Sequence, residues 1–359
     1  MGILDFLKRK EDEAPGQQGQ AEQAASLELQ DFLAPGPYEA SPEGLTPAGL
    51  YPHEVLLLSA ASSFYTDQQK FPTTLRQQYG MLDVRKLLLG LVERGFLESA
   101  TLEATLEGET VVNLKKTLKA CGLPVGGRKA ELIERIATQM SDADLATHFP
   151  RRAFALTQSG KQAVAEAQYV PYVHRRPVEG LTIWEMHRLA LAEPDKTYRG
   201  LILAYMERRS QFHFNAKDYN AYRAMRYRMY QFMLEENKLK KAFPFLVETM
   251  YYDLSGMDSE QRDPIYQFVS EKYFFPYDKS IVKLSATVVN AMTKLQEDLR
   301  LTEGMLRALL LQFFSQYKLP FHLFTHEECA VVILLELRGD KDKLRQVYEL
   351  AEARFGKGK

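Results

Sequence analysis

The stretch LKKTLKACGLPVGGRKAELIERI, residues 114–136, predicts two short helices joined by an extended turn. Apolar residues recur at helical spacing on both sides of that turn: Val111, Leu114 and Leu118 before it, and Leu132, Ile133 and Ile136 after it. The first helix is expected to end at Cys121-Gly122, because glycine readily takes the left-handed conformation that stops a helix. Leu123 follows as a further core residue, so the stretch predicts a small helical hairpin with its own apolar contact.

Positive charge is concentrated on this hairpin. Six cations stand against two acids over residues 111–136, a local charge of +4 in a chain whose formal net charge is −1. The cations are Lys115, Lys116, Lys119, Arg128, Lys129 and Arg135. Since the chain as a whole has almost no net charge, any affinity for an anion must come from a local patch such as this one.

The turn at Gly126-Gly127 has the chemistry of a phosphate contact. Two glycines let another backbone approach closely, and Arg128 and Lys129 bring charge to the same place. The first amides of the second helix have no partner within the helix, and its dipole is positive there. Two roles stay open for Arg135: a contact with DNA, or an ion pair with Glu131 one turn earlier.

The stretch closely resembles the SAP domain, a helix–extended loop–helix module of the form L-K-x-x-L-K-x-x-G-L-x-x-x-G-x-K-x-x-L-x-x-R-[LI]. The residues that match the form are Leu114, Lys115, Leu118, Lys119, Gly122, Leu123, Gly127, Lys129, Leu132, Arg135 and Ile136. One departure is Gly126, where many members have Ser or Thr, which weakens the expected helix cap and leaves the backbone amides available.

Members of this family bind double-stranded DNA, often AT-rich, with little strict sequence preference. The resemblance therefore implies DNA contact through Lys115, Lys116, Lys119, Arg135 and residues Gly126, Gly127, Arg128 and Lys129. Phosphate contacts of this kind position a protein on DNA without reading bases. The alternative interpretation is a helical hairpin whose cations are simply solvated.

The flanks of the hairpin resemble parts of a winged-helix domain. Val84, Leu87, Leu88, Leu91 and Val92 form one helical face, and Gly95 is a plausible stop. Phe96, Leu97 and Leu102 then suggest a strand. Phe154 and Leu156 suggest a second strand, in FALTQSG, which is similar to the second wing strand of winged-helix repressors, and Thr157 and Gly160 turn into a helix. The resemblance places the hairpin as an insertion at the wing.

Both ends of the chain differ from this centre. Residues 1–45 are rich in Gln, Ala, Glu, Pro and Gly and have a charge of −6, so we expect a disordered acidic tail, with ILDFLKR as a possible docking peptide. The segment YVPYVHRRPVEG, residues 169–180, is expected to be a linker. From 181 to 356 the apolar spacing is helical, with breaks expected at Pro194, Pro244, Gly256, Pro264, Pro276 and Pro320.

Two other groups of residues are candidates for a site. Residues 196–241 hold eleven cations against four acids, interleaved with tyrosines, which suits either a nucleic-acid face or a core helix with solvated cations. On that helix Tyr222, Met225, Met229 and Phe232 form an apolar stripe, which favours the core. His322, His326 and Cys329 have a spacing compatible with zinc, but Thr325 and Glu328 form a capping box, which favours a structural role.

The whole chain fits a DNA-binding protein in a reducing cytoplasm. Two distant cysteines give no disulfide framework, and no apolar run reaches the roughly 20 residues of a membrane span. No phosphate-binding loop, dinucleotide fingerprint or nucleophile elbow is present, so we expect no cofactor, no metal and no catalytic residue. Two rivals stay open: a protein-interaction scaffold, and an enzyme whose site lies in the helical domain.

The predicted architecture is mainly α, in the style of a bacterial or phage protein. The expected order is an acidic tail (1–45), the first part of a winged-helix-like domain (46–108), a SAP domain (109–145), the second wing strand and helix (146–175), and an α-helical domain (176–359). The last of these is expected to recruit a protein partner or to self-associate.

Overall fold

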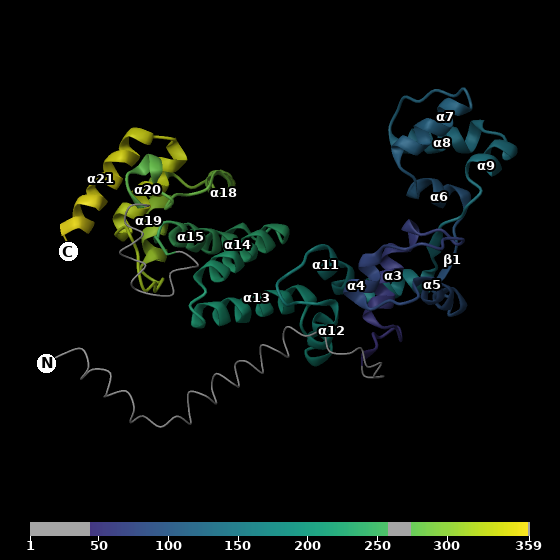
Figure 1. The fold of residues 1–359 in the computed structure, drawn as a ribbon, viewed down its shortest axis with the longest axis horizontal. Coiled ribbons are helices and arrows are strands. Elements are labelled where there is room, and N and C mark those ends of the chain that lie inside the picture. The colour runs from purple at the N-terminus through teal and green to yellow at the C-terminus, as the bar shows by residue number, and fades with distance from the viewer. Residues whose placement is uncertain (1–43, 258–273, 358–359) are drawn as a thin grey trace, which may run out of the picture. The chain divides into compact units, whose positions relative to one another are not determined.

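The computed structural model describes residues 44–257 and 274–357, and it is mainly helical (Figure 1). The chain divides into two compact units, Met1–Tyr198 and Arg199–Lys359. ILDFLKR and nearly all of the acidic tail, together with Pro264, lie outside the described residues, so the predictions made for them stay predictions. In the described ranges, no helix has the length and apolar character that a membrane crossing requires.

The first unit is built around one apolar helix. Its elements before residue 100 are α3 (Pro52–Ala60), η3 (Ala61–Ser63), α4 (Thr73–Tyr79), α5 (Val84–Glu93) and β1 (Leu97–Ser99). Those after residue 150 are β2 (Phe154–Leu156), α10 (Gln158–Glu166), α11 (Tyr169–Arg175) and α12 (Ile183–Ala192). Helix α3 is buried from Pro52 to Leu58, and α5, α10, α11 and α12 all pack against it. This buried helix is therefore the centre of the body of the unit.

Both strands predicted from the sequence are present, and they form hydrogen bonds with each other. β1 and β2 are antiparallel, with Leu97 opposite Leu156 and Ser99 opposite Phe154. Leu102, predicted to belong to the first strand, instead lies at the start of helix α6, because Thr101 caps that helix by accepting from the Ala104 amide at 3.2 Å. The strand pair is thus shorter than predicted, and the likeness to winged-helix proteins stays a prediction.

After the second strand, the start of α10 lies very close to the backbone that leads into β1. The Thr157 hydroxyl accepts from the Gly160 amide at 3.1 Å and so caps α10, as the sequence predicted. A Cβ atom at Gly160 would lie 2.1 Å from the Phe96 carbonyl oxygen, so only glycine fits where α10 crosses the chain leading into β1. The same close approach holds α10 against the strand pair.

Four helices lie between the two strands in the chain and enclose a separate small core. They are α6 (Leu102–Gly108), α7 (Val111–Ala120), α8 (Lys129–Gln139) and α9 (Asp142–His148). The buried members of their apolar cluster are Leu106, Leu114, Leu118, Leu132, Ile136, Met140 and Phe149, with Leu123 and Ile133 partly buried at its edge. The core residues predicted for the hairpin are therefore in place, and Leu106 of α6 completes the buried cluster with Met140 and Phe149, which directly follow α8 and α9.

The predicted linker over residues 169–180 is wrong in its first half. Residues 169–175 form α11, whose Tyr169, Val170, Pro171 and Val173 are buried. Proline is tolerated there because the first turn of a helix needs no donor from it. Since α11 and α12 pack on each other and on α3, the first unit continues to Tyr198, beyond the end expected at residue 175.

In the second unit every regular element that the structure describes is helical. They are α13 (Tyr198–Asn215), α14 (Tyr219–Glu235), α15 (Leu239–Asp253), η4 (Tyr277–Lys279), α18 (Ala286–Asp298), α19 (Glu303–Phe314), α20 (His326–Arg338) and α21 (Lys341–Lys357). The break predicted at Pro244 is wrong, because Pro244 lies inside α15. The chain turns instead between α14 and α15, where Asn237 has a φ of 54°.

The predicted stripe Tyr222, Met225, Met229 and Phe232 is buried in α14, as expected of a core helix. At the start of α20 the predicted capping box is present, with the Thr325 hydroxyl accepting from the Glu328 amide at 3.2 Å. In the part of the chain that the structure describes, no His, Cys, Asp and Glu side chains gather as a metal site would need.

Candidate nucleic-acid interface

Helix α7 separates apolar and cationic residues onto opposite faces. Leu114 and Leu118 are fully buried, whereas the opposite face carries the α7 stripe, which we define as Val112, Lys115, Lys116 and Lys119. These four positions fall on one side because residues three and four apart are neighbours on a helix. All four are exposed. Val111, predicted to share the buried face, is 39% exposed at the first helical position.

The end of α7 has the hydrogen bonds of a Schellman motif. Gly122 has a φ of 71°, its amide donates to the Lys119 carbonyl at 3.2 Å, and the Leu123 amide donates to the Leu118 carbonyl at 2.8 Å. Leu123 packs against the small core directly after this turn. The predicted stop at Cys121-Gly122 is thereby explained, and the chain leaves α7 in one fixed direction.

Arg135 holds the extended loop between α7 and α8. Its Nη1 atom donates to the carbonyl oxygens of Pro124 and Gly126, at 2.7 Å and 2.9 Å. In place of the ion pair with Glu131 that the sequence left open, Arg135 makes these two bonds to loop backbone. One guanidinium nitrogen carries two hydrogens, so it can bridge two carbonyls that lie close together. Arg135 fixes the shape of the loop that presents Gly126, Gly127 and Arg128.

Glu131 closes the turn from the other side. A carboxylate oxygen of Glu131 accepts from the Arg128 amide at 3.3 Å, and Gly127 has a φ of 118°. The positive φ favours glycine, and a Cβ atom at Gly127 would lie 2.4 Å from that oxygen, so any other residue would also displace the Glu131 carboxylate. The sequence predicted free amides at the start of α8, but Glu131 already lies there. A phosphate at this turn would have to share the position with a carboxylate.

The two basic residues of the turn differ in their surroundings. Lys129 is half-buried, and its Nζ atom donates to the carbonyl oxygen of Glu107 at 2.5 Å, near the end of α6. A cation is stabilised there because the carbonyl end of a helix is negative. The Arg128 side chain is exposed. Arg128 is therefore the more available of the two for an external anion.

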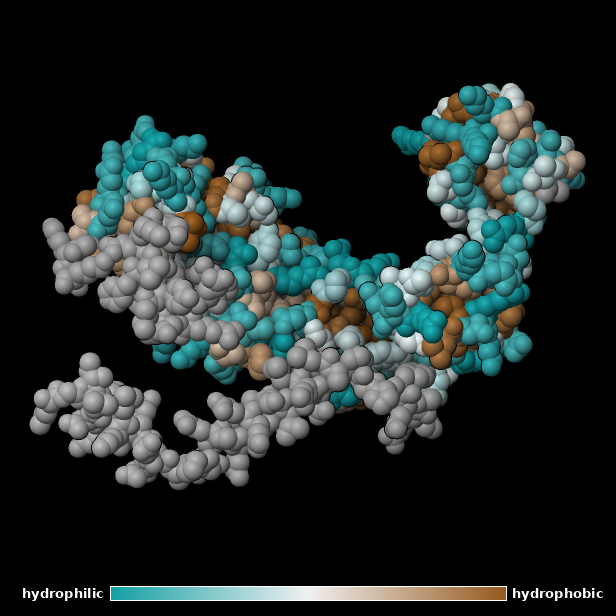
Figure 2. Space-filling model, in the orientation of Figure 1, coloured by the Kyte–Doolittle hydropathy of each residue, from teal (hydrophilic) through white to brown (hydrophobic). Residues whose placement is uncertain are grey.

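Within the described residues, four cations of the domain form neither an ion pair nor a side-chain hydrogen bond, whereas Lys129 and Arg135 donate to backbone carbonyls. Across the described residues, Lys115, Lys116, Lys119 and Arg128 form no ion pair. In Figure 2 the small helical domain at the upper right shows hydrophilic and hydrophobic patches side by side. Exposed, unpaired cations keep their full charge for an external anion, and association through them weakens as salt is added.

A contact that the sequence did not reveal joins this domain to the body. The Tyr65 hydroxyl donates to a carboxylate oxygen of Glu109, whose other oxygen accepts from the Asn113 side chain at 3.0 Å. The hydrogen bond to Glu109 is the main cause that raises the pKa of Tyr65 to about 12. The central guanidinium carbon of Arg151 lies over the Tyr65 ring, 4.2 Å from the ring centre. Residue 109 is far from residue 65 in the sequence, so no local pattern could indicate the pair.

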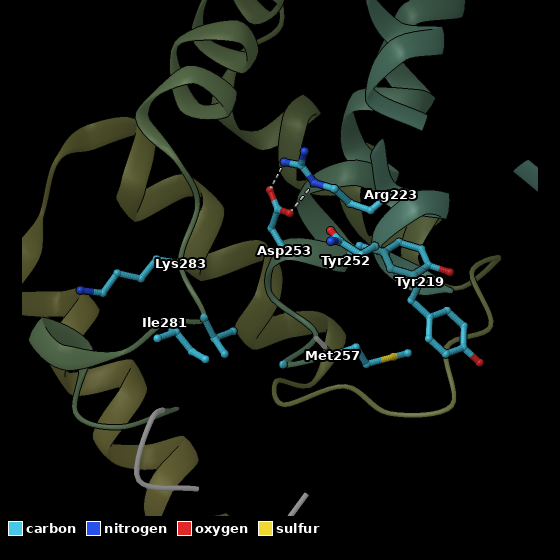
Figure 3. Close-up of a pocket in the computed structure, with 10 residues that line it drawn as sticks. Tyr219, Arg223, Tyr252, Asp253, Met257, Ile281 and Lys283 are labelled. Carbon is cyan, nitrogen blue, oxygen red and sulfur yellow. Dashed lines mark hydrogen bonds and ion pairs between the residues drawn. The ribbon is translucent and has the colours of Figure 1, made fainter. Parts of the chain in front are cut away.

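The second basic stretch, residues 196–241, is organised differently. Arg223 makes two hydrogen bonds of 2.7 Å to the carboxylate of Asp253, drawn in Figure 3. Arg226 contacts Glu207 at 2.9 Å and Glu248 at 3.1 Å. Burial raises the pKa of Asp253, and the bound guanidinium opposes that change. These arginines are paired with acids of the same unit, which argues against a free phosphate-binding face at their positions.

A cavity of about 380 Å³ lies beside the Arg223–Asp253 pair. Figure 3 shows Tyr219, Tyr252, Met257, Ile281 and Lys283 around it. Asp253 is the one acid among the described residues that line it, and its oxygens are both bound by Arg223. Several convergent acids or histidines would have supported an enzyme site in the helical domain, and the described lining of this cavity holds one acid, so the enzyme hypothesis stays untested.

Comparison with known proteins bears on the small domain. A family model, SAP domain, matches residues 109–139, which include α7, the loop and α8. No curated protein and no solved structure matches the chain. The matched residues coincide with the hairpin whose core, Schellman turn and unpaired cations are described above, and a SAP domain indicates nucleic-acid binding in general. The chain therefore carries a SAP domain at residues 109–139.

Proposed function

We propose that this protein binds duplex DNA through its SAP domain, with little sequence selectivity and without a catalytic step of its own. The observation that carries the proposal is the set of unpaired cations on the α7 stripe and at Arg128. Side chains of this kind contact phosphates, which are the same in every sequence. The bridging by Arg135 supports the proposal because it holds the loop in one shape before DNA arrives.

Lys129 and Glu131 refine the expected contact. Lys129 already donates one of its three ammonium hydrogens to the Glu107 carbonyl, which restricts its position, and a phosphate near Gly127 meets the Glu131 carboxylate. We therefore assign the main contacts to the α7 stripe and Arg128, with Gly126, Gly127 and Lys129 as secondary ones. Arg135 acts through the loop.

The test is a titration of the full chain with a short duplex of mixed sequence at about 50 mM and about 200 mM salt. One variant replaces Lys115, Lys116 and Lys119 with glutamine. Removing one lysine that neutralises a phosphate should reduce the slope of log affinity against log salt by about 0.9, so this variant should have a slope smaller by about 2 to 3 units.

A matched control replaces three exposed lysines of the second unit, Lys217, Lys240 and Lys241, with glutamine, giving the same change in net charge. We expect the control to bind like the unaltered chain. Equally weakened binding in the two triple variants would show that general charge, not the SAP surface, holds the DNA, and the proposal would then fail.

A further inference from the structure

The α7 stripe has an apolar end that phosphate binding does not explain. Val112 is 74% exposed at the beginning of the stripe, and Val111 beside it is 39% exposed. Val125, in the loop that leads to Arg128, is 40% exposed. Phosphates need cations and amides, not valines. A ligand with both carboxylates and apolar side chains would match the whole surface better than a phosphate backbone does.

One segment of the same chain has that chemistry. Residues 11–43 contain eight Asp or Glu and neither Lys nor Arg, a charge of −8. Apolar residues are placed among these acids: Leu27, Leu29, Phe32, Leu33 and Tyr38. The segment Leu29-Gln30-Asp31-Phe32-Leu33 alone offers an acid flanked by large apolar side chains. Charge and apolar character are thus both complementary to the α7 stripe.

The residue that follows this segment lies in the same compact unit as the SAP domain. Gly44, which follows it directly, is held by its carbonyl oxygen 2.9 Å from the Nε2 atom of His187, a buried residue of α12. A chain of this length spans at most about 110 Å when fully extended, ample for a small domain. Tethering gives such a segment an effective concentration on the order of millimolar, so even a weak contact is populated.

We propose that residues 11–43 bind the α7 stripe of the SAP domain and compete there with DNA. Carboxylates pair with Lys115, Lys116 and Lys119, and apolar side chains of the segment cover Val112. Duplex DNA, with its denser line of charge, displaces the segment. The competition with DNA rests on the proposed function, whereas the contact between segment and stripe does not.

Cross-linking tests the contact without DNA. A zero-length carbodiimide reagent joins a carboxylate to a lysine amine only when the two touch. In the full chain we expect amide links between acids of 11–43 and Lys115, Lys116 or Lys119, found by mass spectrometry and abolished at high salt. If these lysines link only to acids outside 11–43, or to none while other lysines of the chain do link, the inference is overturned.

A pair of matched variants tests the competition. In one, Glu22, Glu28, Asp31 and Glu39 become Gln, Gln, Asn and Gln. In the control, four exposed acids of the second unit, Glu297, Asp298, Glu349 and Glu352, are replaced by the corresponding amides. We expect the first variant to bind duplex DNA about tenfold more tightly at low salt, as removal of a weak tethered competitor predicts, and the control to bind about as tightly as the unaltered chain.

The tighter binding must also depend on the stripe. When Lys115, Lys116 and Lys119 are already glutamine, neutralising the four acids of the segment should change affinity no more than neutralising the control acids does. Equal increases in affinity in segment and control variants would reduce the effect to net charge and overturn the competition. Absence of salt-dependent DNA binding in every variant, with the cross-links present, would instead refute the proposed function and leave the contact standing.

Discussion

The Nη1 atom of Arg135 lies 2.9 Å from the carbonyl oxygen of Gly126, nine positions earlier in the chain. Together with the bond to Pro124, this contact ties the second helix of the SAP domain to the loop before it. Arg135, a cation of the sequence motif, thus binds the backbone of its own domain, although its charge suggests a contact with DNA.

Replacing Arg135 with methionine should loosen the loop. Hydrogen bonds to charged groups contribute about 1.5 to 3 kcal/mol to stability. Because the Arg135 side chain is only half-buried, we expect the substitution to reduce the free energy of unfolding of the domain by the lower end of that range. Amide hydrogen exchange over residues 122–128 should accelerate. Arg128→Met, which removes an unpaired guanidinium of the same size, is the control, and comparable exchange in both variants would contradict the role assigned to Arg135.

The two glycines of the turn should respond differently to alanine. Gly127→Ala places a Cβ atom against Glu131 in a backbone conformation that alanine avoids, and should destabilise the domain by about 1 to 3 kcal/mol. Gly126→Ala meets no atom within 4 Å and should be nearly neutral. Thermal unfolding of the two variants checks this order, and a reversed order would mean that the turn has a different shape.

Leu132→Ala should unfold the SAP domain locally. Leu132 is fully buried in a cluster of only a few large side chains, and such truncations cost about 2 to 5 kcal/mol. Hydrogen exchange should rise across α6 to α9 and stay slow in α3. Val112→Ala, at a 74% exposed position, should change stability by less than about 0.5 kcal/mol. Faster exchange in α3 as well would show that the two cores unfold together.

His322 should make the second unit sensitive to acid. Its Nε2 atom donates to the Tyr251 carbonyl at 2.9 Å, and Nδ1 accepts from the Phe324 amide at 3.2 Å. Burial lowers the pKa of His322 from 6.5 to about 4, so the folded unit holds the neutral ring. Because the unfolded chain takes up a proton first, stability is full above pH 6.5 and falls as pH drops towards 4.

The decrease in stability over that interval should approach about 3 kcal/mol, since each pKa unit corresponds to about 1.4 kcal/mol. Chemical unfolding at several pH values, followed by tyrosine fluorescence, measures it. His322→Gln cannot be protonated and should flatten this part of the pH profile. An unchanged profile in that variant would assign the sensitivity to other groups.

Local patterns predicted much of the SAP domain and little of its surroundings. The spacing of Leu114, Leu118, Leu132 and Ile136 fixes which faces are buried, and Gly122 fixes where the first helix stops. Those signals lie within one or two helical turns. The contacts of Arg135 with the loop and of Tyr65 with Glu109 depend on how separate segments close in space, and composition alone cannot specify that.

The two wrong predictions, a break at Pro244 and a linker over residues 169–180, have the same cause. Pro244 disfavours a helix locally, by about 3 kcal/mol, yet α15 continues through it because Phe243, Leu246 and Val247 are buried around it. The prolines and glycine of residues 169–180 suggested a linker, but Tyr169, Val170 and Val173 are buried beside α3 and α12. In both places tertiary packing outweighs local preference, and a single sequence does not show that packing.

The pairing of Ser99 with Phe154 means that the chain leaves the body of the first unit and returns to it at neighbouring points. For the body, residues 100–153 amount to an enlarged hairpin connection. Lengthening a flexible connection from two residues to that size costs only about 3 kcal/mol of closure entropy, and the insert offsets this with a core of its own. Removing such a segment would therefore leave the body with a turn to close and would cost it the few contacts that the insert makes with it, such as that of Tyr65 with Glu109.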